Sequence, residues 1–181
     1  MKRTVMAVVV AGLLSAAGSA LSAQGIRIGV SGGMLLPMGD YKNGDKAGFL
    51  VGVDGTYWLA GNTIGIRLDG SYSQTSEKSG VPAHKSKMIG GLAEIVYAFM
   101  TPADQIRPYI LGGVGMFNVK LSASGLDTSE TKVGFGGGAG LALKLGTGST
   151  RVFVEGRYTS VKAFDTTLPS LGIKAGLRFG S

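Results

Sequence analysis

Two side chains suited to nucleophilic catalysis stand near the middle of the chain. His84 is the only histidine, and Ser86 follows it at a spacing that puts both on one face of an extended strand. An imidazole beside a hydroxyl is the arrangement that activates serine nucleophiles. Lys85 lies between the two residues and Lys87 follows them, as in a solvated polar loop. We favour the loop interpretation and expect no catalytic residue.

Cofactor and metal chemistry find little support in the remaining residues. The glycine-rich segment 134–139 fits a loose dinucleotide-binding pattern, but no helix follows it to hold a phosphate at its N-terminus. Cysteine is absent, there is one histidine, and the loop acids lack the spacing of a calcium loop. We therefore expect no cofactor and no metal.

Composition excludes two further classes of protein. The net charge is +7 at pH 7, but Lys and Arg are scattered singly, whereas a nucleic-acid surface needs a clustered basic face. We expect no nucleic-acid partner. The 32 glycines have no three-residue period, which excludes collagen.

The N-terminus has the pattern of an export signal. Lys2 and Arg3 precede an apolar run over 5–17, and small residues follow. This predicts a signal peptide over 1–23, with cleavage after Ala20 as the alternative, and a mature domain over 24–181. No later segment is long and apolar enough for a membrane-spanning helix.

The mature chain alternates between apolar and polar residues with a period of two. In the last segment, apolar side chains from Leu171 to Phe179 alternate with glycines and the basic residues Lys174 and Arg178. Eight such segments are predicted as strands: 26–36, 48–60, 63–75, 87–100, 107–120, 132–145, 151–161 and 168–179. The links after even-numbered strands are short, and the links after odd-numbered strands are mostly longer and polar. This predicts an all-β, eight-stranded antiparallel up-and-down transmembrane β-barrel with periplasmic turns and extracellular loops.

Aromatic residues on the predicted apolar face gather in two zones, as expected of two lipid–water interfaces. Those near the long loops are Phe49, Tyr72, Phe117, Phe135 and Tyr158, and those near the short turns are Tyr57, Tyr97, Phe99, Tyr109 and Phe179. A soluble barrel core has no reason to sort its rings in this way. We predict two aromatic girdles with an aliphatic zone between them.

The predicted inner face carries charges of both signs, which must pair in a narrow interior. They are Arg27, Asp54, Arg67, Asp69, Glu94, Lys144, Glu155, Arg157, Lys174 and Arg178. We expect Arg67 to pair with Asp54 and Glu94. We expect Arg178 to pair with Glu155. Because eight strands leave room only for side chains, this network should plug the lumen; a gated conduit for small ions is the alternative.

Three segments resemble small eight-stranded outer-membrane barrels of the OmpA, OmpX and opacity-protein kind, the outer membrane protein beta-barrel domain. They are residues 33–40 (GMLLPMGD), 107–115 (RPYILGGVG) and 153–158 (FVEGRY). The terminal LGIKAGLRF resembles the strand that the barrel-assembly machinery recognises, except that Gly180 and Ser181 follow Phe179. The resemblance covers the mature chain and implies the bacterial outer membrane, with lipid and the assembly machinery as partners.

The resemblance says less about activity, because this family includes adhesins, proteins of host-defence evasion, structural anchors and many members of unknown role; porin-like is one further description that we expect to apply. We expect a non-enzymatic barrel whose extracellular loops contact a partner, with Val81, Leu126 and Phe164 as candidate anchors. One alternative is an outer-leaflet enzyme of the lipid A deacylase type, which uses a His/Ser/Glu arrangement. A further alternative is a soluble periplasmic lipocalin-like binding barrel.

Overall fold

The computed structural model describes residues 25–59, 61–77, 84–123, 126–163 and 166–180. These residues contain eight strands: β1 (Ile26–Pro37), β2 (Gly48–Trp58), β3 (Ile64–Ser76), β4 (His84–Ala98), β5 (Ile106–Ala123), β6 (Leu126–Lys144), β7 (Arg151–Ala163) and β8 (Thr166–Phe179). The predicted signal peptide and the candidate anchors Val81 and Phe164 lie outside the described residues, and Leu126 begins β6.

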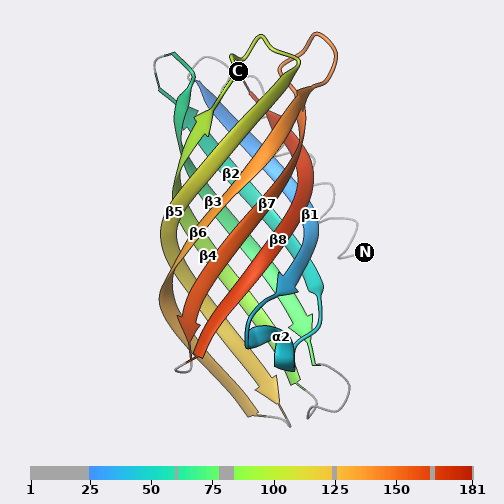
Figure 1. The fold of residues 1–181 in the computed structure, drawn as a ribbon, viewed down its shortest axis with the longest axis vertical. Helices are drawn as coiled ribbons and strands as arrows, with labels where there is room; N and C mark the ends of the chain where they lie inside the picture. Colours follow the sequence, from blue (N-terminus) through green and yellow to red (C-terminus); the bar gives the residue numbers. More distant parts are fainter. Residues whose placement is uncertain (1–24, 60, 78–83, 124–125, 164–165, 181) are drawn as a thin grey trace, which may run out of the picture.

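The strands form one closed antiparallel barrel, as predicted (Figure 1). Each strand pairs with its neighbours in sequence, and β1 closes the barrel against β8 with Ile28 opposite Phe179. Closure matters because lipid offers no hydrogen bonds to an open sheet edge. Gly61 and Asn62, both with positive φ, form the short β2–β3 link that the sequence predicts.

Apolar side chains point outward and charged ones inward. Val154, Leu177 and Ile66 are all exposed on the outer face, whereas Glu155 is completely buried. In a soluble carrier these apolar side chains would pack together in the interior. The alternative of a lipocalin-like soluble barrel is therefore wrong. Among the described residues, no helix is long and apolar enough to cross a membrane.

One predicted loop is instead a hairpin. The sequence pattern placed a polar loop between β5 and β6, but the two strands stay paired as far as Ala123 and Leu126. Figure 1 shows β5 and β6 reaching beyond β1, β2, β7 and β8 at the end opposite the C-terminus. The prediction was wrong because this part of the hairpin has polar side chains on its outer face, and such a segment has the same composition as a loop.

A short helix partly covers the same end of the barrel. Helix α2 (Tyr41–Gly44) lies in the β1–β2 link and buries Tyr41. The Tyr41 hydroxyl lies 2.9 Å from that of Thr75, which donates to Asp45 at 2.5 Å. An isolated antiparallel β-bridge between the backbones of Asp45 and Glu77 connects this link to the end of β3. The opening at the long-link end is thus narrowed by hydrogen-bonded residues of the β1–β2 link.

Candidate functional site: the barrel interior and its two ends

The predicted inner-face charges lie inside the barrel. Nine of the ten are buried, and Lys144, near the short-turn end of β6, is half-buried. The nine buried charges come from six strands: β1, β2, β3, β4, β7 and β8. Because alternate residues of every strand point inward, charges that are distant in the sequence meet in the lumen.

Glu155 is the centre of the network. Its carboxylate accepts hydrogen bonds from Arg67 at 2.9 Å, Arg157 at 2.8 Å and Arg178 at 3.2 Å. Lys174 lies 3.3 Å away, and the Tyr109 hydroxyl donates at 2.9 Å. One carboxylate therefore joins cations from β3, β7 and β8 across the lumen.

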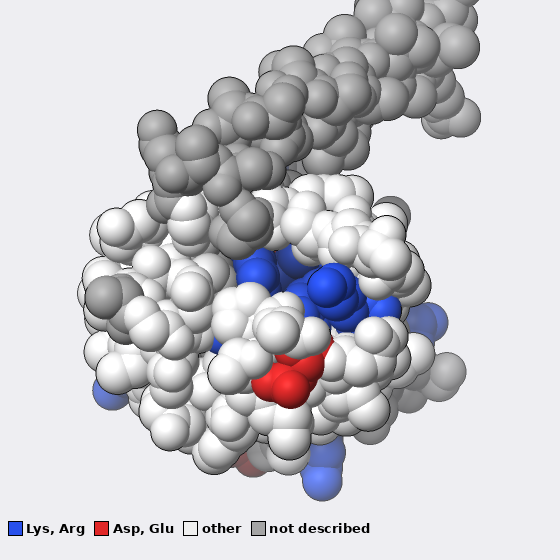
Figure 2. All heavy atoms as spheres, turned by 90° about the horizontal axis from the view of Figure 1, so that it is seen from above, with Lys and Arg blue, Asp and Glu red and all other residues white. Residues whose placement is uncertain are grey.

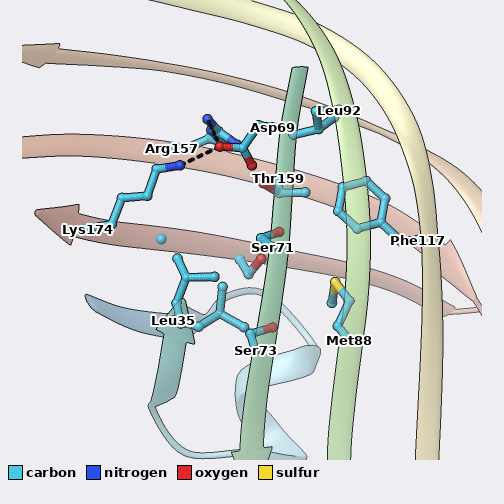
Figure 3. Close-up of a pocket in the computed structure, with 13 residues that line it drawn as sticks. Leu35, Asp69, Ser71, Ser73, Met88, Leu92, Phe117, Arg157, Thr159 and Lys174 are labelled. Carbon is cyan, nitrogen blue, oxygen red and sulfur yellow. Dashed lines mark hydrogen bonds and ion pairs between the residues drawn. The ribbon is translucent and has the colours of Figure 1, made fainter. Parts of the chain in front are cut away.

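A second group of pairs lies next to it (Figure 3). Asp69, on β3, accepts from Arg157 at 2.8 Å and from Lys174 at 2.7 Å, so its carboxylate connects cations of β7 and β8 across the lumen. Glu94 pairs with Arg157 at 3.1 Å, whereas the sequence pattern suggested Arg67 as its partner. Both charges of each pair are buried, which makes the geometry of these hydrogen bonds decisive for stability.

Asp54 completes the network on strand β2. It lies 3.5 Å from Arg67 and accepts from Arg178 at 3.0 Å. The ion pairs of the interior join four carboxylates to four cations: Asp54, Asp69, Glu94 and Glu155 with Arg67, Arg157, Lys174 and Arg178. We call these eight residues the central network, and its formal charge is zero.

Two predicted girdle residues lie inside instead of facing lipid. Tyr109 and Phe117 are 4% and 3% exposed. Strand β5 is apolar on both faces, so alternation alone does not select which face turns outward. The signal that the sequence interpretation missed is the glycine opposite each ring. Gly90 faces Phe117 and Gly140 faces Tyr109 in register, and a Cβ on either glycine would collide with the ring.

The other eight girdle residues lie on the outer face. Phe49 and Tyr72 contact each other with ring centroids 5.7 Å apart, toward the long-link end. Tyr97 and Phe99 form an edge-to-face pair at 5.1 Å near the short turns. Phe135, Tyr158 and Tyr57 are exposed, and Phe179 is half-buried. Rings at these two levels suit the headgroup regions of a bilayer.

Two buried arginines were absent from the predicted network. Arg107 and Arg151 are the second residue of β5 and the first residue of β7, and both are 2% exposed. Their positions beside predicted turns gave no alternation by which to assign a face. Their inward parity relative to Tyr109 and Glu155 is the signal that identifies them.

The interior contains little free space near the central network. The cavity beside Asp69, Arg157 and Lys174 measures about 40 Å³, room for a few water molecules (Figure 3). Met88, Leu92 and Phe117 form its apolar side. A cavity of about 20 Å³ lies on the short-turn side of the network. At the two ends the cavities are larger, about 220 Å³ beside Tyr41 and about 390 Å³ beside Lys144.

The candidate nucleophile has an unfavourable position for a lipid substrate. Ser86 is 4% exposed and lines the interior cavity beside Tyr41. Burial raises the pKa of Tyr41 to about 12, so its phenol stays neutral at physiological pH. His84 is the first residue of β4. In the described part of the chain, no three potential metal ligands cluster.

A closed eight-stranded barrel with an apolar outer surface and a charged interior defines the class of small outer-membrane barrels. The sequence matches the outer membrane protein beta-barrel domain over residues 6–179, and the chain belongs to that family. It is a bacterial outer-membrane protein, and its apolar outer surface faces membrane lipid.

Solved structures have the same fold at low sequence identity. Neisserial surface protein A superposes with a TM-score of 0.65 and 18% identity, covering 87% of this chain and 97% of that one. OprG from Pseudomonas aeruginosa gives 0.60 and 16%, covering 87% and 97%. The outer membrane enzyme PagL gives 0.52 and 15%, covering 86% and 99%. A comparison with curated protein sequences gave no match.

Proposed function

We propose that this protein is a non-enzymatic outer-membrane barrel that makes contacts at the cell surface through its β5–β6 hairpin. The observation that carries the proposal is a change in the outward side chains of that hairpin. Met116 and Val133 are opposite each other, apolar and exposed. Asn118 and Thr131 form the next outward pair, and their exposed polar side chains hydrogen-bond at 3.0 Å.

This change supports a lipid–water boundary between the two pairs, since exposed apolar side chains suit acyl chains and polar ones suit water. The five residue-to-residue steps from Thr131 to Leu126 add about 13 Å along the barrel axis at a strand tilt of about 40°. A paired hairpin in water loses little conformational freedom when a partner binds, which favours recognition.

The balanced central network supports a plugged lumen over a wide pore. The cavity beside Asp69 holds a few waters at most, and the pairs of Glu155 extend across the interior. The buried position of Ser86 argues against a deacylase, because a lipid substrate approaches the outer face of the barrel. The proposal includes export with removal of residues 1–23 and insertion by the barrel-assembly machinery.

Cells that display three forms of the protein test this proposal. The first form is wild type. In the second, residues 120–129 are replaced by Asn-Gly, which joins the paired Val119 and Glu130 in a tight turn. The third carries His84→Ala and Ser86→Ala. A shift between cold and boiled samples on SDS gels shows that each form is folded.

We expect cells with wild type and with the third form to adhere to surfaces coated with matrix glycoproteins or sulfated polysaccharides. Cells with the shortened hairpin should lose that adhesion, and the lipid A of all three should be identical by mass spectrometry. Removal of an acyl chain that depends on His84 and Ser86 would establish the enzyme instead. Adhesion that is unaffected by the shortened hairpin would refute the assigned surface.

A further inference from the structure

The short-turn end of the barrel gathers cations outside the central network. Arg27, Arg107 and Arg151 are buried there, with exposed fractions of 6%, 2% and 2%, and Lys144 is half-buried beside them. We call these four residues the mouth cluster. Figure 2, which views the barrel from this end, shows basic side chains gathered inside the opening.

The mouth cluster has four cations and no carboxylate within ion-pair distance in the described part of the barrel. None of the ion pairs among the described residues includes a mouth-cluster cation. Asp104, in the β4–β5 turn, is close enough to attract Arg107 and Arg151 but forms no ion pair with them. It accepts from the backbone and hydroxyl of Thr101 at 2.8 and 2.7 Å, and these bonds, together with the two arginines, lower the pKa of its carboxyl. Lys144 and Arg151 are directly opposite each other in register, an unfavourable arrangement for like charges.

Part of the cluster has a structural role. Arg107 donates to the carbonyl oxygens of Met100, at 2.9 Å, and Asn62. Arg151 donates to the carbonyl of Pro102 at 2.6 Å. These bonds connect the short turns to the barrel, and they use only some of the guanidinium donors.

Three other donors of the cluster are buried without an acceptor. They are Arg27 Nε, Arg107 Nη1 and Arg151 Nη1. The Arg27 guanidinium lies 5.9 Å from the centre of the Trp58 ring, and that of Arg107 lies 4.0 Å from it. A buried donor without an acceptor is costly and rare, so three of them at one end of the lumen indicate a place for an acceptor from outside the chain.

The space beside these donors is large enough for a polyatomic anion. The outer cavity of about 390 Å³ is lined by Arg27, Lys144 and Arg151, together with Thr147 and Ser149. Arg27 and Arg151 also line the inner cavity, where Arg107 joins them. The donors of three strands therefore converge on one opening, on the side that faces the periplasm.

We propose that the mouth cluster binds a phosphate group, carried by free inorganic phosphate or by a lipid headgroup of the periplasmic leaflet. The planar guanidinium matches phosphate oxygens with two parallel hydrogen bonds. A group with several oxygens and up to two negative charges can accept from three arginines at once, and it offsets more of their charge than a carboxylate, which carries one negative charge. The hydroxyls of Thr147 and Ser149 add neutral donors at the outer edge.

Calorimetric titration of the folded protein in a phosphorus-free detergent tests the proposal. Inorganic phosphate and a short-chain phosphatidic acid are titrated separately into wild type, Arg27→Gln, Lys144→Gln and the control Lys162→Gln. Lys162 is exposed on β7 toward its opposite end, so its replacement removes the same charge away from the mouth. Lys144→Gln provides a second test, at a half-buried site, if Arg27→Gln does not fold.

We expect saturable binding at one site, about tenfold weaker in Arg27→Gln and weakened in Lys144→Gln, with Lys162→Gln like wild type. Binding of both titrants identifies the phosphate group itself as the ligand, and binding of phosphatidic acid alone identifies the lipid headgroup. Absence of binding by both titrants would overturn the proposal. Equal weakening in all three variants would also overturn it, as an effect of net charge.

Discussion

The middle of the lumen and its short-turn end use arginine in opposite ways. In the middle, Arg67, Arg157 and Arg178 each face carboxylates, and the central network has no net charge. At the end, Arg27 and Arg151 face no carboxylate within ion-pair distance in the described part of the barrel. Each has a buried donor without an acceptor, as Arg157 also has, but Arg157 is neutralised by its carboxylates. Burial is similar in the two regions. The balance of charge therefore separates an arginine that stabilises the barrel from one available to a ligand.

The largest expected effect comes from removing the carboxylate that serves the middle region. Glu155→Ala leaves Arg67, Arg157 and Arg178 buried without their shared acceptor, so we expect a loss of about 3 to 5 kcal/mol in the free energy of unfolding. Urea titration of the protein in lipid vesicles measures this loss. A change below about 1 kcal/mol would contradict the role of Glu155 as the centre of the network.

The next effect sharpens the contrast between interior and exterior. Val154 is adjacent to Glu155 but points outward and is 51% exposed. Val154→Arg places a positive charge on the lipid face, and we expect it to lower the free energy of unfolding by about 2 to 4 kcal/mol. Thr131→Arg, beyond the boundary on β6, is the matched control and should cost about 0 to 1 kcal/mol. Equal losses of unfolding free energy for the two variants in the same urea titration would mean that both residues face the same medium, which would contradict a lipid–water boundary between them.

A smaller effect is expected at the long-link end, where the hydroxyls of Tyr41 and Thr75 hold the β1–β2 link. Tyr41→Phe removes the hydrogen bond to Thr75 while Thr75 keeps Asp45 as acceptor, so the expected loss is about 1 kcal/mol. The raised pKa of Tyr41 means that the folded state favours the neutral phenol. The stabilisation that Tyr41 gives the folded state is fully present below pH 10, the ordinary pKa of tyrosine, and is lost as the pH rises toward about 12. Stability measured from pH 9 to 12 should fall more steeply in wild type than in Tyr41→Phe, and parallel curves would contradict this.

The smallest effect is expected at the mouth. Arg27 has no ion pair or hydrogen bond that its removal would break within the described residues, so Arg27→Gln should leave stability within about 1 kcal/mol of wild type, or raise it. This result contrasts directly with Glu155→Ala. A loss of 3 kcal/mol or more in phosphate-free buffer would show that Arg27 belongs to the structural network, and the distinction between the two regions would fail.

How far the sequence predicts this structure differs from strand to strand. In β7, the outward Val154 and Tyr158 alternate with the inward Glu155 and Arg157, so the polarity of the side chains identifies the inward face. In β5 both faces are apolar, and the orientation of Phe117 depends on the space left by Gly90 on the neighbouring strand. That space is a property of register, which is fixed only when the whole barrel closes.

The ends of strands are less predictable for the same reason. Arg107 and Arg151 stand beside turns, where two or three residues do not establish a period of two. The β5–β6 hairpin loses its apolar alternation where it leaves lipid, although its backbone pairing continues. The individual ion pairs also depend on register, since Arg157 reaches both Asp69 and Glu94 across the lumen.

The central claim is that the outward side chains of this barrel lie in lipid while its charges fill the interior. Because the chain has no cysteine, single spin labels at Val154→Cys and Thr131→Cys test it directly in bilayers. We predict that the label at 154 is accessible to dissolved oxygen and protected from a water-soluble nickel chelate, with the opposite pattern at 131. A label at 154 that the chelate reaches freely would contradict the account.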